Sequence, residues 1–341
     1  MIPHILTLAL TAAAAQQVVE TQGPSTAERA LVTVVGRDSS GAVRARSIGI
    51  ALTPEGHILT SAHPLHGTAV LEVRTAGGGT YRVKRTLAES ISAELVRLEV
   101  ELANSFPHAA LSEEVPGSGE RVFILAPGRR IETVVQTARN ISGLGTVLQL
   151  GALAHGDLTG APLANAEGRI AGMVLWRSRS RPDTYFAAAA DLAASLHPRR
   201  DAAARHSKAC GDRAEDLYRD GVERLVAQQF DEARRYFERA TDSDPRCAPA
   251  WFHLGFTFAK LGRPGERVNA YRQAIAVKPD FAEAHYSLGV AYALANRRSD
   301  ALEEQKILEK LDADLAAQLA MLIAAVTHSE PQEAPETKTR I

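Results

Sequence analysis

The chain has almost no net charge, few cysteines and no long apolar segment. The 39 Lys and Arg residues nearly balance the 40 Asp and Glu residues, so nothing indicates a nucleic-acid partner or an anionic membrane. No internal run approaches the ~18 apolar residues that a membrane-spanning helix needs, and no membrane span is predicted. The only two cysteines, Cys210 and Cys247, either form one disulfide in an oxidising compartment or remain two thiols.

The first 15 residues are short and apolar. They contain Ile5, Leu6, Leu8 and Leu10, followed by small alanines. A secretory signal has an apolar core of roughly 7–15 residues and small residues before its cleavage site, although the usual basic residue is missing here. We therefore expect residues 1–15 to be a signal peptide and the protein to be periplasmic or extracellular. The alternative is an apolar N-terminus that is not a signal.

The composition changes near residue 197. Residues 24–196 are rich in Val, Ile, Thr and Gly, in short runs separated by turn signals, which is the pattern of a β-barrel or sandwich. Residues 197–213 are basic and polar and are interpreted as a linker, whereas residues 214–327 have helical periodicity. Residues 328–341 hold few apolar residues and are predicted to be disordered. The apolar runs are 31–35, 48–52, 70–73, 122–125, 146–150 and 170–175.

The helical half repeats itself every 34 residues. Gly221, Gly255 and Gly289 are spaced by this step, as are Pro245 and Pro279. Small residues let paired helices approach closely, and a proline ends the second helix of a unit. The strongest single stretch is Trp251, Leu254, Gly255, Phe258, Tyr271, Ala274 and Pro279. This pattern resembles the tetratricopeptide repeat (TPR) family, and it predicts three stacked units and a capping helix within residues 214–327.

Aromatic residues recur at the same step. The resemblance implies that the first helix of each unit lines a concave groove that accepts peptides, where rigid aromatic side chains suit binding. The Lys and Asn set that clamps a C-terminal carboxylate in some members is absent. The alternative is that these aromatic residues pack helix on helix. The predicted groove residues are Tyr218, Phe252, Phe256, Tyr286 and Val290.

Four segments of the first half carry a second resemblance. A glycine-flanked strand at residues 47–51 precedes the sequence Ile-Leu-Thr-Ser-Ala-His at 58–63. An acidic residue opens the strand at 94–100, and Thr-Gly-Ala-Pro-Leu follows at 159–163. In this order they resemble the trypsin-like serine proteases, and among them the HtrA/Deg family. The resemblance implies an all-β chymotrypsin-like double barrel, here followed by an all-α TPR solenoid, with no obvious PDZ segment between them.

The resemblance places a degenerate catalytic triad. His63 matches the general base of the family. The acid position holds Glu94, since no aspartate occurs between Asp38 and Asp157. The nucleophile position holds Thr159, whose additional methyl group crowds the attack path and stiffens the side chain.

The oxyanion hole is also altered. Its position two residues before the nucleophile is normally Gly but here is Asp157, and an inward carboxylate has the wrong charge. If the register shifts by one residue, Leu158 takes the nucleophile position and no hydroxyl remains. Loss of one oxyanion donor costs ~10²–10³ in rate, and loss of the nucleophile costs on the order of 10⁶. We therefore expect no catalytic residue.

Structural roles are open for the same positions. His63 can pack between the barrels, Glu94 can be a solvated residue at a strand start, and Asp157 and Thr159 can bond the local backbone. Histidines at 57 and 66 flank His63, but they straddle a strand and a turn without a Cys or carboxylate cluster. No metal site and no cofactor are therefore predicted.

Three arginines, Arg177, Arg179 and Arg181, alternate with serines after the run at 170–175. They form either a basic rim for an acidic partner or an exposed strand edge protected by charge.

Two functions follow from these observations. The first is an exported, catalytically inactive trypsin-like domain, a pseudoprotease, joined to a TPR array that binds protein or peptide segments as an adaptor or scaffold. The second is an active or weakly active endopeptidase that uses Thr159, His63 and Glu94, with the repeats recruiting its substrate.

Overall fold

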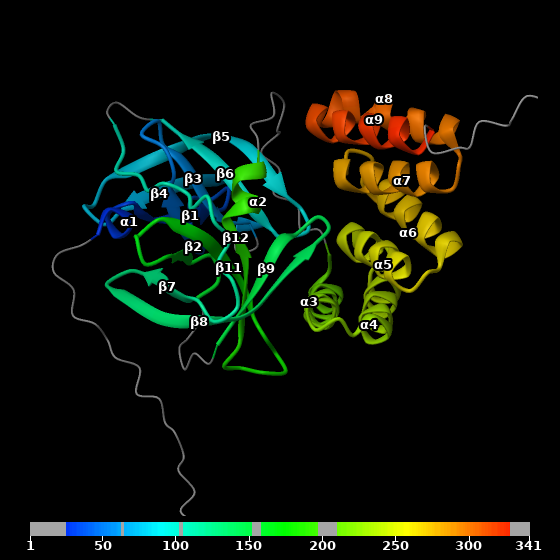
Figure 1. Ribbon diagram of the computed structural model, residues 1–341. Helices are drawn as coiled ribbons and strands as arrows, with labels where there is room; N and C mark the ends of the chain where they lie inside the picture. The colour runs from blue at the N-terminus through cyan, green and yellow to red at the C-terminus, as the bar shows by residue number, and fades with distance from the viewer. Residues whose placement is uncertain (1–24, 63–64, 102–104, 152–157, 197–209, 328–341) are drawn as a thin grey trace, which may run out of the picture.

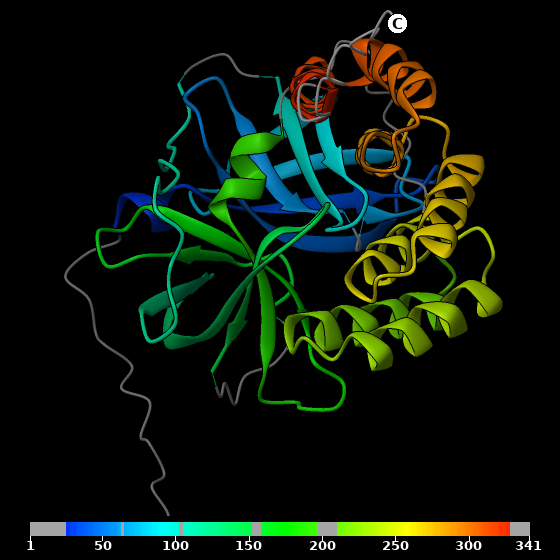
Figure 2. The same cartoon turned by 45° about the vertical axis from the view of Figure 1, so that its right-hand side comes forward.

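The structure is a computed structural model that describes residues 25–62, 65–101, 105–151, 158–196 and 210–327 (Figure 1). Within these residues, two β-barrels are followed by an array of helices that lies along one side of them (Figure 2). The predicted signal peptide, most of the predicted linker and the predicted disordered tail lie outside the described residues. Among the described residues, no helix is long and apolar enough to span a membrane.

The first barrel is closed and antiparallel. A short helix, α1 (Thr26–Arg29), leads into it, and its strands follow the spatial order β1-β2-β3-β6-β5-β4. Successive side chains of a strand point to opposite faces of the barrel wall. Ile58 lies opposite Leu98 on one face and Ile50 lies opposite Leu59 on the other, and all four have no exposed surface. The strands are β1 (Leu31–Arg37), β2 (Val43–Ala51), β3 (His57–Ser61), β4 (Val70–Thr75), β5 (Thr80–Ser90) and β6 (Leu95–Val100).

The second barrel repeats the same strand order, read as β7-β8-β9-β12-β11-β10, and is closed in the same way. A second apolar cluster around Leu150, Leu163, Val174 and Tyr185 fills it. Each predicted apolar run falls on a strand, apart from one terminal residue, and the predicted chymotrypsin-like double barrel is confirmed. The elements are β7 (Arg121–Ala126), β8 (Arg129–Ile141), β9 (Gly145–Leu150), β10 (Pro162–Ala164), β11 (Ile170–Arg177), β12 (Tyr185–Ala189) and the helix α2 (Ala190–Ser195).

The helical array consists of three antiparallel helix pairs and a final helix. The first helices of the pairs are α3, α5 and α7, and each packs on the helix that follows it. Helix α9 packs on both α7 and α8, as expected of a cap. The helices are α3 (Asp212–Val226), α4 (Phe230–Ser243), α5 (Ala248–Lys260), α6 (Pro264–Val277), α7 (Ala282–Leu294), α8 (Arg298–Leu311) and α9 (Ala313–Thr327).

The glycines of the 34-residue repeat mark the closest approach of these helices. A Cβ atom at Gly221 or Gly255 would lie 2.6 Å from an aromatic ring of the second helix, Phe237 or Tyr271. In the third pair the nearest atom belongs instead to Leu319 of α9, 2.4 Å from a Cβ built at Gly289. The cap therefore takes the place that an aromatic ring fills in the first two pairs.

A disulfide joins Cys210 to Cys247, with an S–S distance of 2.01 Å and a Cα–Cα distance of 4.4 Å. Cys210 lies two residues before α3 and Cys247 lies immediately before α5, so the bond closes the first helix pair into a loop. Of the two alternatives left by the sequence, the structure has the disulfide.

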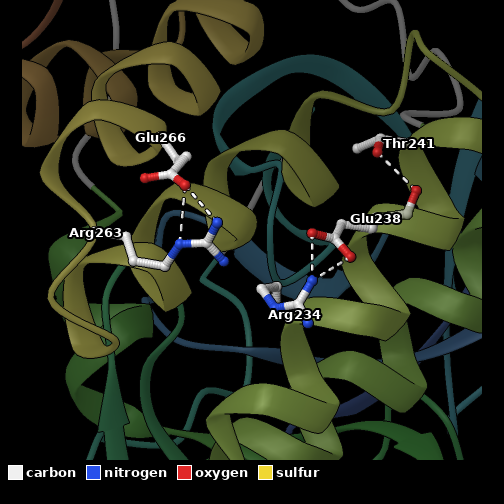
Figure 3. A network of polar contacts seen from close by, with 5 residues as sticks. All are labelled: Arg234, Glu238, Thr241, Arg263 and Glu266. Atoms are coloured by element: carbon white, nitrogen blue, oxygen red, sulfur yellow. Dashed lines mark hydrogen bonds and ion pairs between the residues drawn. The ribbon is translucent and has the colours of Figure 1, made fainter.

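Ion pairs lie within α4 and at the start of α6 (Figure 3). Arg234 pairs with Glu238 one turn later on α4 at 2.6 Å, and Arg263 pairs with Glu266 at the start of α6. Thr241 Oγ1 donates a hydrogen bond to the Glu238 carbonyl at 2.8 Å. Partly exposed pairs of this kind contribute little to stability, ~0–1 kcal/mol each.

Candidate functional site

The strand ends of the first barrel position the acid of the predicted triad. Ser61, at the end of β3, lies opposite Leu95 at the start of β6. The Ala62 N–H then donates a hydrogen bond to the Glu94 carbonyl at 2.6 Å. Glu94 is therefore held beside the residue that precedes His63 in the chain. His63 itself lies outside the described residues.

Glu94 is not a solvated strand residue. Its side chain is 17% exposed, and its Oε2 lies 3.4 Å from Nη2 of Arg219 on α3. Its φ of +50° is unusual for a residue with a side chain. Arg219 also pairs with Glu215, one turn earlier on α3. Arg219 of α3 therefore pairs both with Glu94, the acid position of the predicted triad, and with Glu215 of its own helix.

The loop at the nucleophile position is tied to β11. Gly160 N–H donates to the Val174 carbonyl at 2.8 Å, and Val174 N–H donates to the Ala161 carbonyl at 2.9 Å. Gly160 has φ +79°, and a Cβ there would lie 2.8 Å from Ser47 Oγ on β2 of the other barrel. Only glycine combines this conformation with this close approach, so the loop is pressed against the first barrel.

Leu158 and Thr159 have different surroundings. Leu158 is fully buried in the apolar cluster of the second barrel, whereas Thr159 is half-buried. Leu158 thus belongs to the core of the second barrel, and the assignment of Thr159 to the nucleophile position stays a prediction. Asp157 lies outside the described residues, as does His63, and the expectation that neither is catalytic stays a prediction.

Helix α3 docks on two turns of the barrels. The Tyr218 hydroxyl donates a hydrogen bond to the Ser92 carbonyl at 2.8 Å, in the β5–β6 turn formed by residues 91–94. On the second barrel, Ser178 Oγ donates to Glu223 Oε2 at 2.8 Å, in the β11–β12 loop formed by residues 178–184. The same helix therefore contacts the turn that carries Glu94 and the loop after β11.

The arginine-rich loop after β11 has its acidic partner within this chain. Arg179 Nη1 lies 2.8 Å from Asp216 Oδ2 on α3. Burial raises the pKa of Glu223. The hydrogen bond from the Ser178 hydroxyl and the charge of the nearby Arg181 partly offset this rise. One of the three arginines, Arg179, therefore has an acidic partner on helix α3, and the choice between the two interpretations of the whole group stays open.

Helix α5 docks on a third turn. A Cβ atom at Gly143, in the β8–β9 turn formed by residues 142–144, would lie 2.6 Å from the ring of Phe252. Next to Phe252, His253 has no exposed surface and stacks on Phe237 with ring centroids 5.8 Å apart. Burial lowers the pKa of His253 to about 4, although its contacts with the Pro249 and Ser142 backbone act in the opposite direction. Its imidazole is therefore neutral at pH 7.

The five predicted groove residues fall into two groups. Tyr218 is 5% exposed and Phe252 is 0% exposed, and both already contact the barrels. Burial, together with the charge of Glu94, raises the pKa of Tyr218 well above its usual value. Phe256, Tyr286 and Val290 are half-buried. Peptide binding stays a prediction, and the barrels already occupy the part of the face that bears Tyr218 and Phe252.

Most of the docking contacts left no recognisable pattern in the sequence. Ser92 and Gly143 lie in turns, and Arg219 and Glu223 lie on a helix with many charges. Only the arginines at 177, 179 and 181 pointed to an acidic partner. Within the described residues, no group of three or more His, Cys, Asp or Glu side chains is arranged to hold a metal ion.

Comparisons with known proteins identify the repeats. A tetratricopeptide repeat family profile matches residues 218–266, and a TPR repeat profile matches residues 268–295. The array therefore contains TPR repeats, as predicted. The peroxisomal targeting signal receptor of Candida albicans is 37% identical over 71 residues, which are 21% of this chain and only 12% of that receptor.

Two solved proteases are similar to part of this chain. The serine endoprotease from Yersinia pestis has a TM-score of 0.43 and 20% identity, and the match covers 50% of this chain and 61% of that one. The Rv3671c protease from M. tuberculosis, in its active form, has a TM-score of 0.43 and 17% identity, with 57% and 92% covered. The assignment of the fold rests on the strand order of the two barrels rather than on these likenesses.

Proposed function

We propose that this chain is a catalytically inactive, exported, protease-like scaffold whose TPR array binds protein segments. The observation that carries the proposal is the ion pair between Arg219 and Glu94, 3.4 Å apart. It ties the acid position of the cleft to the array, so the two halves act as one unit.

The chemistry of a triad opposes such a pairing. The acid of a working triad orients the histidine and stabilises the imidazolium that forms when the nucleophile loses its proton. A guanidinium beside that acid offsets its negative charge and disfavours a second positive charge nearby. Arg219 therefore weakens the support that Glu94 can give to His63, in addition to the substitution of the nucleophile by Thr159.

The array offers an apolar face for a partner. Phe256 on α5 and Tyr286 and Val290 on α7 are half-buried, and Leu294 at the end of α7 is 60% exposed. Incompletely buried apolar and aromatic side chains on neighbouring first helices support a binding surface, because their burial by a partner is favourable.

Activity-based labelling tests the inactive cleft. We expect no labelling of the purified chain by a fluorophosphonate probe and no casein turnover above that of the His63→Ala variant. Thr159→Ser is also expected to stay unlabelled, because Asp157 and Glu94 remain. Labelling of the native chain that Thr159→Ala abolishes would show an active nucleophile and overturn the proposal.

Selection of peptides from a display library tests the binding surface. Peptides selected on the full chain are expected to bind Tyr286→Ala about tenfold more weakly, because a partly exposed aromatic anchor is lost. Met321→Ala is the matched control, since Met321 is an apolar residue of α9 that is 72% exposed. Equal affinities for all three proteins would refute binding at this surface.

The disulfide supports the proposed export, because disulfides persist in oxidising compartments. Thiol alkylation of intact cells, followed by mass analysis without reductant, tests it. We expect Cys210 and Cys247 to escape alkylation in protein recovered from the periplasm or medium. Recovery of the protein in the cytosol with both thiols alkylated would contradict export.

A further inference from the structure

The β5–β6 turn, residues 91–94, occupies the array as a ligand would. Its sequence is Ile91-Ser92-Ala93-Glu94; residues of α3 contact it, and it packs against the apolar cluster of the later helices. Three kinds of group take part: an apolar side chain, a main-chain carbonyl and a carboxylate. Their partners define what this part of the array recognises.

The apolar contact is made by Ile91. Its partly buried side chain packs against the apolar cluster that contains Phe252, Phe281 and Leu288. This cluster is built from the second and third helix pairs and α9, so Ile91 adds a barrel side chain to the apolar packing of the array. Burial of such a side chain is favoured in proportion to the apolar area removed from water.

The polar contacts are made by the first helix. The Tyr218 hydroxyl donates to the Ser92 carbonyl at 2.8 Å, and Arg219 lies 3.4 Å from the Glu94 carboxylate. The carbonyl contact is independent of the side chain at that position, whereas the arginine contact requires an acid. The left-handed backbone at Glu94, with φ +50°, makes the occupant a reverse turn rather than an extended strand.

We propose that this surface of the array is a recognition site for a turn in which an acidic residue follows an apolar one by three positions, and that the chain fills the site with its own β5–β6 turn. The partner is then a second protein that presents a β-hairpin turn of this pattern. The inference rests on the proposed binding function of the array and names its partner class. Displacement of the internal turn by the partner would also release Glu94 from Arg219.

Competition between an internal and an external turn has a measurable consequence. A tethered occupant acts at an effective concentration in the mM range, so the intact chain binds an external turn more weakly than an open array does. Variants that weaken only the internal turn must therefore tighten external binding. Glu94→Gln removes the charge at constant size, and about fivefold tighter binding is expected. Ile91→Ala removes part of the apolar contact, and about tenfold is expected.

The probe is a head-to-tail cyclic peptide of residues 88–97. Ala88 and Arg97 lie opposite each other in the β5–β6 ladder, so cyclisation presents the same turn. Its affinity for the full chain is measured by fluorescence anisotropy. Glu167→Gln, an exposed substitution in the turn before β11, is the matched control and leaves the affinity unchanged. Adding Arg219→Ala to Glu94→Gln weakens binding, since the cation of the site is lost.

Four results would overturn the inference, and the last of them leaves the proposed function intact. The first is that Glu94→Gln binds the cyclic peptide no more tightly than the native chain. This variant is isosteric, and circular dichroism verifies that it folds. The second is equal binding of a cyclic peptide with Ser and Gln at the positions of Ile91 and Glu94. The third is dimerisation of the chain through exchanged turns, which would make a second copy the occupant. A chain that captures library peptides through Tyr286 but ignores the cyclic peptide refutes this inference and leaves the proposed function intact.

Discussion

A methyl group at Gly143 tests the contact between the β8–β9 turn and the array. The added Cβ would lie 2.6 Å from the ring of Phe252, at a residue with φ +77°. The left-handed backbone costs roughly 1–2 kcal/mol for a residue with a side chain. Forcing a methyl group into a packed contact costs about 1–3 kcal/mol more. Phe252 is completely buried and has no open space to enter, so Gly143→Ala is expected to destabilise the chain by about 2–5 kcal/mol.

The matched control separates the two costs. Gly128, in the β7–β8 turn, has φ +72° with no atom within 4 Å of an added Cβ, so Gly128→Ala carries the backbone cost alone. Urea unfolding gives the stabilities, and hydrogen exchange of α5 locates the effect at the interface. In a Phe252→Leu background the additional cost of Gly143→Ala is expected to shrink, as a double-mutant cycle detects. Equal effects of the two glycine substitutions would refute the contact.

Three further perturbations test other parts of the molecule. Reduction of the Cys210–Cys247 disulfide, whose cysteines are 37 residues apart, is expected to lower stability by about 4 kcal/mol in the chain-entropy treatment; an unchanged thermal midpoint with reductant would contradict this. Because burial holds the pKa of His253 at about 4, the folded chain binds fewer protons than the unfolded chain between that pH and about 6.5. Its stability is then complete above about pH 6.5 and falls by up to about 3 kcal/mol as the pH approaches 4; the same fall in His253→Gln would assign it to other groups. Gly255→Ala is expected to lower the thermal midpoint, since a Cβ there meets a ring at 2.6 Å, whereas Gly265→Ala, with open space, is not; equal midpoints would argue against close helix packing.

Local pattern predicted much of the fold. Strands such as β1 and β11 appear as apolar runs because the barrel interior buries most of their residues. The long strands β5 and β8 escaped that criterion. In β5 only the C-terminal half is mostly buried, and in β8 exposed residues interrupt the apolar ones. The repeats were predictable because close helix packing requires glycine and bulky residues at a fixed period.

The contacts at the candidate site were not predictable, because they depend on how the barrels and the helical array pack against each other. Tyr218 and Phe252 have the right spacing for a groove, and only the docked barrels reveal that turns of the same chain cover them. The same holds for Leu158. Its burial is seen only in the structure, where the second barrel encloses it.

The bond between Cys210 and Cys247 also sets how the chain bears tension. Residues 197–209 connect the barrels to Cys210, and the sulfur bridge carries a pull from there directly to the residue before α5. Helices α3 and α4 lie inside the closed loop and are bypassed by that force. If a partner draws the far end of the array away from the barrels, the load falls on α5 to α9, while the first helix pair stays folded under strain that would otherwise stretch it.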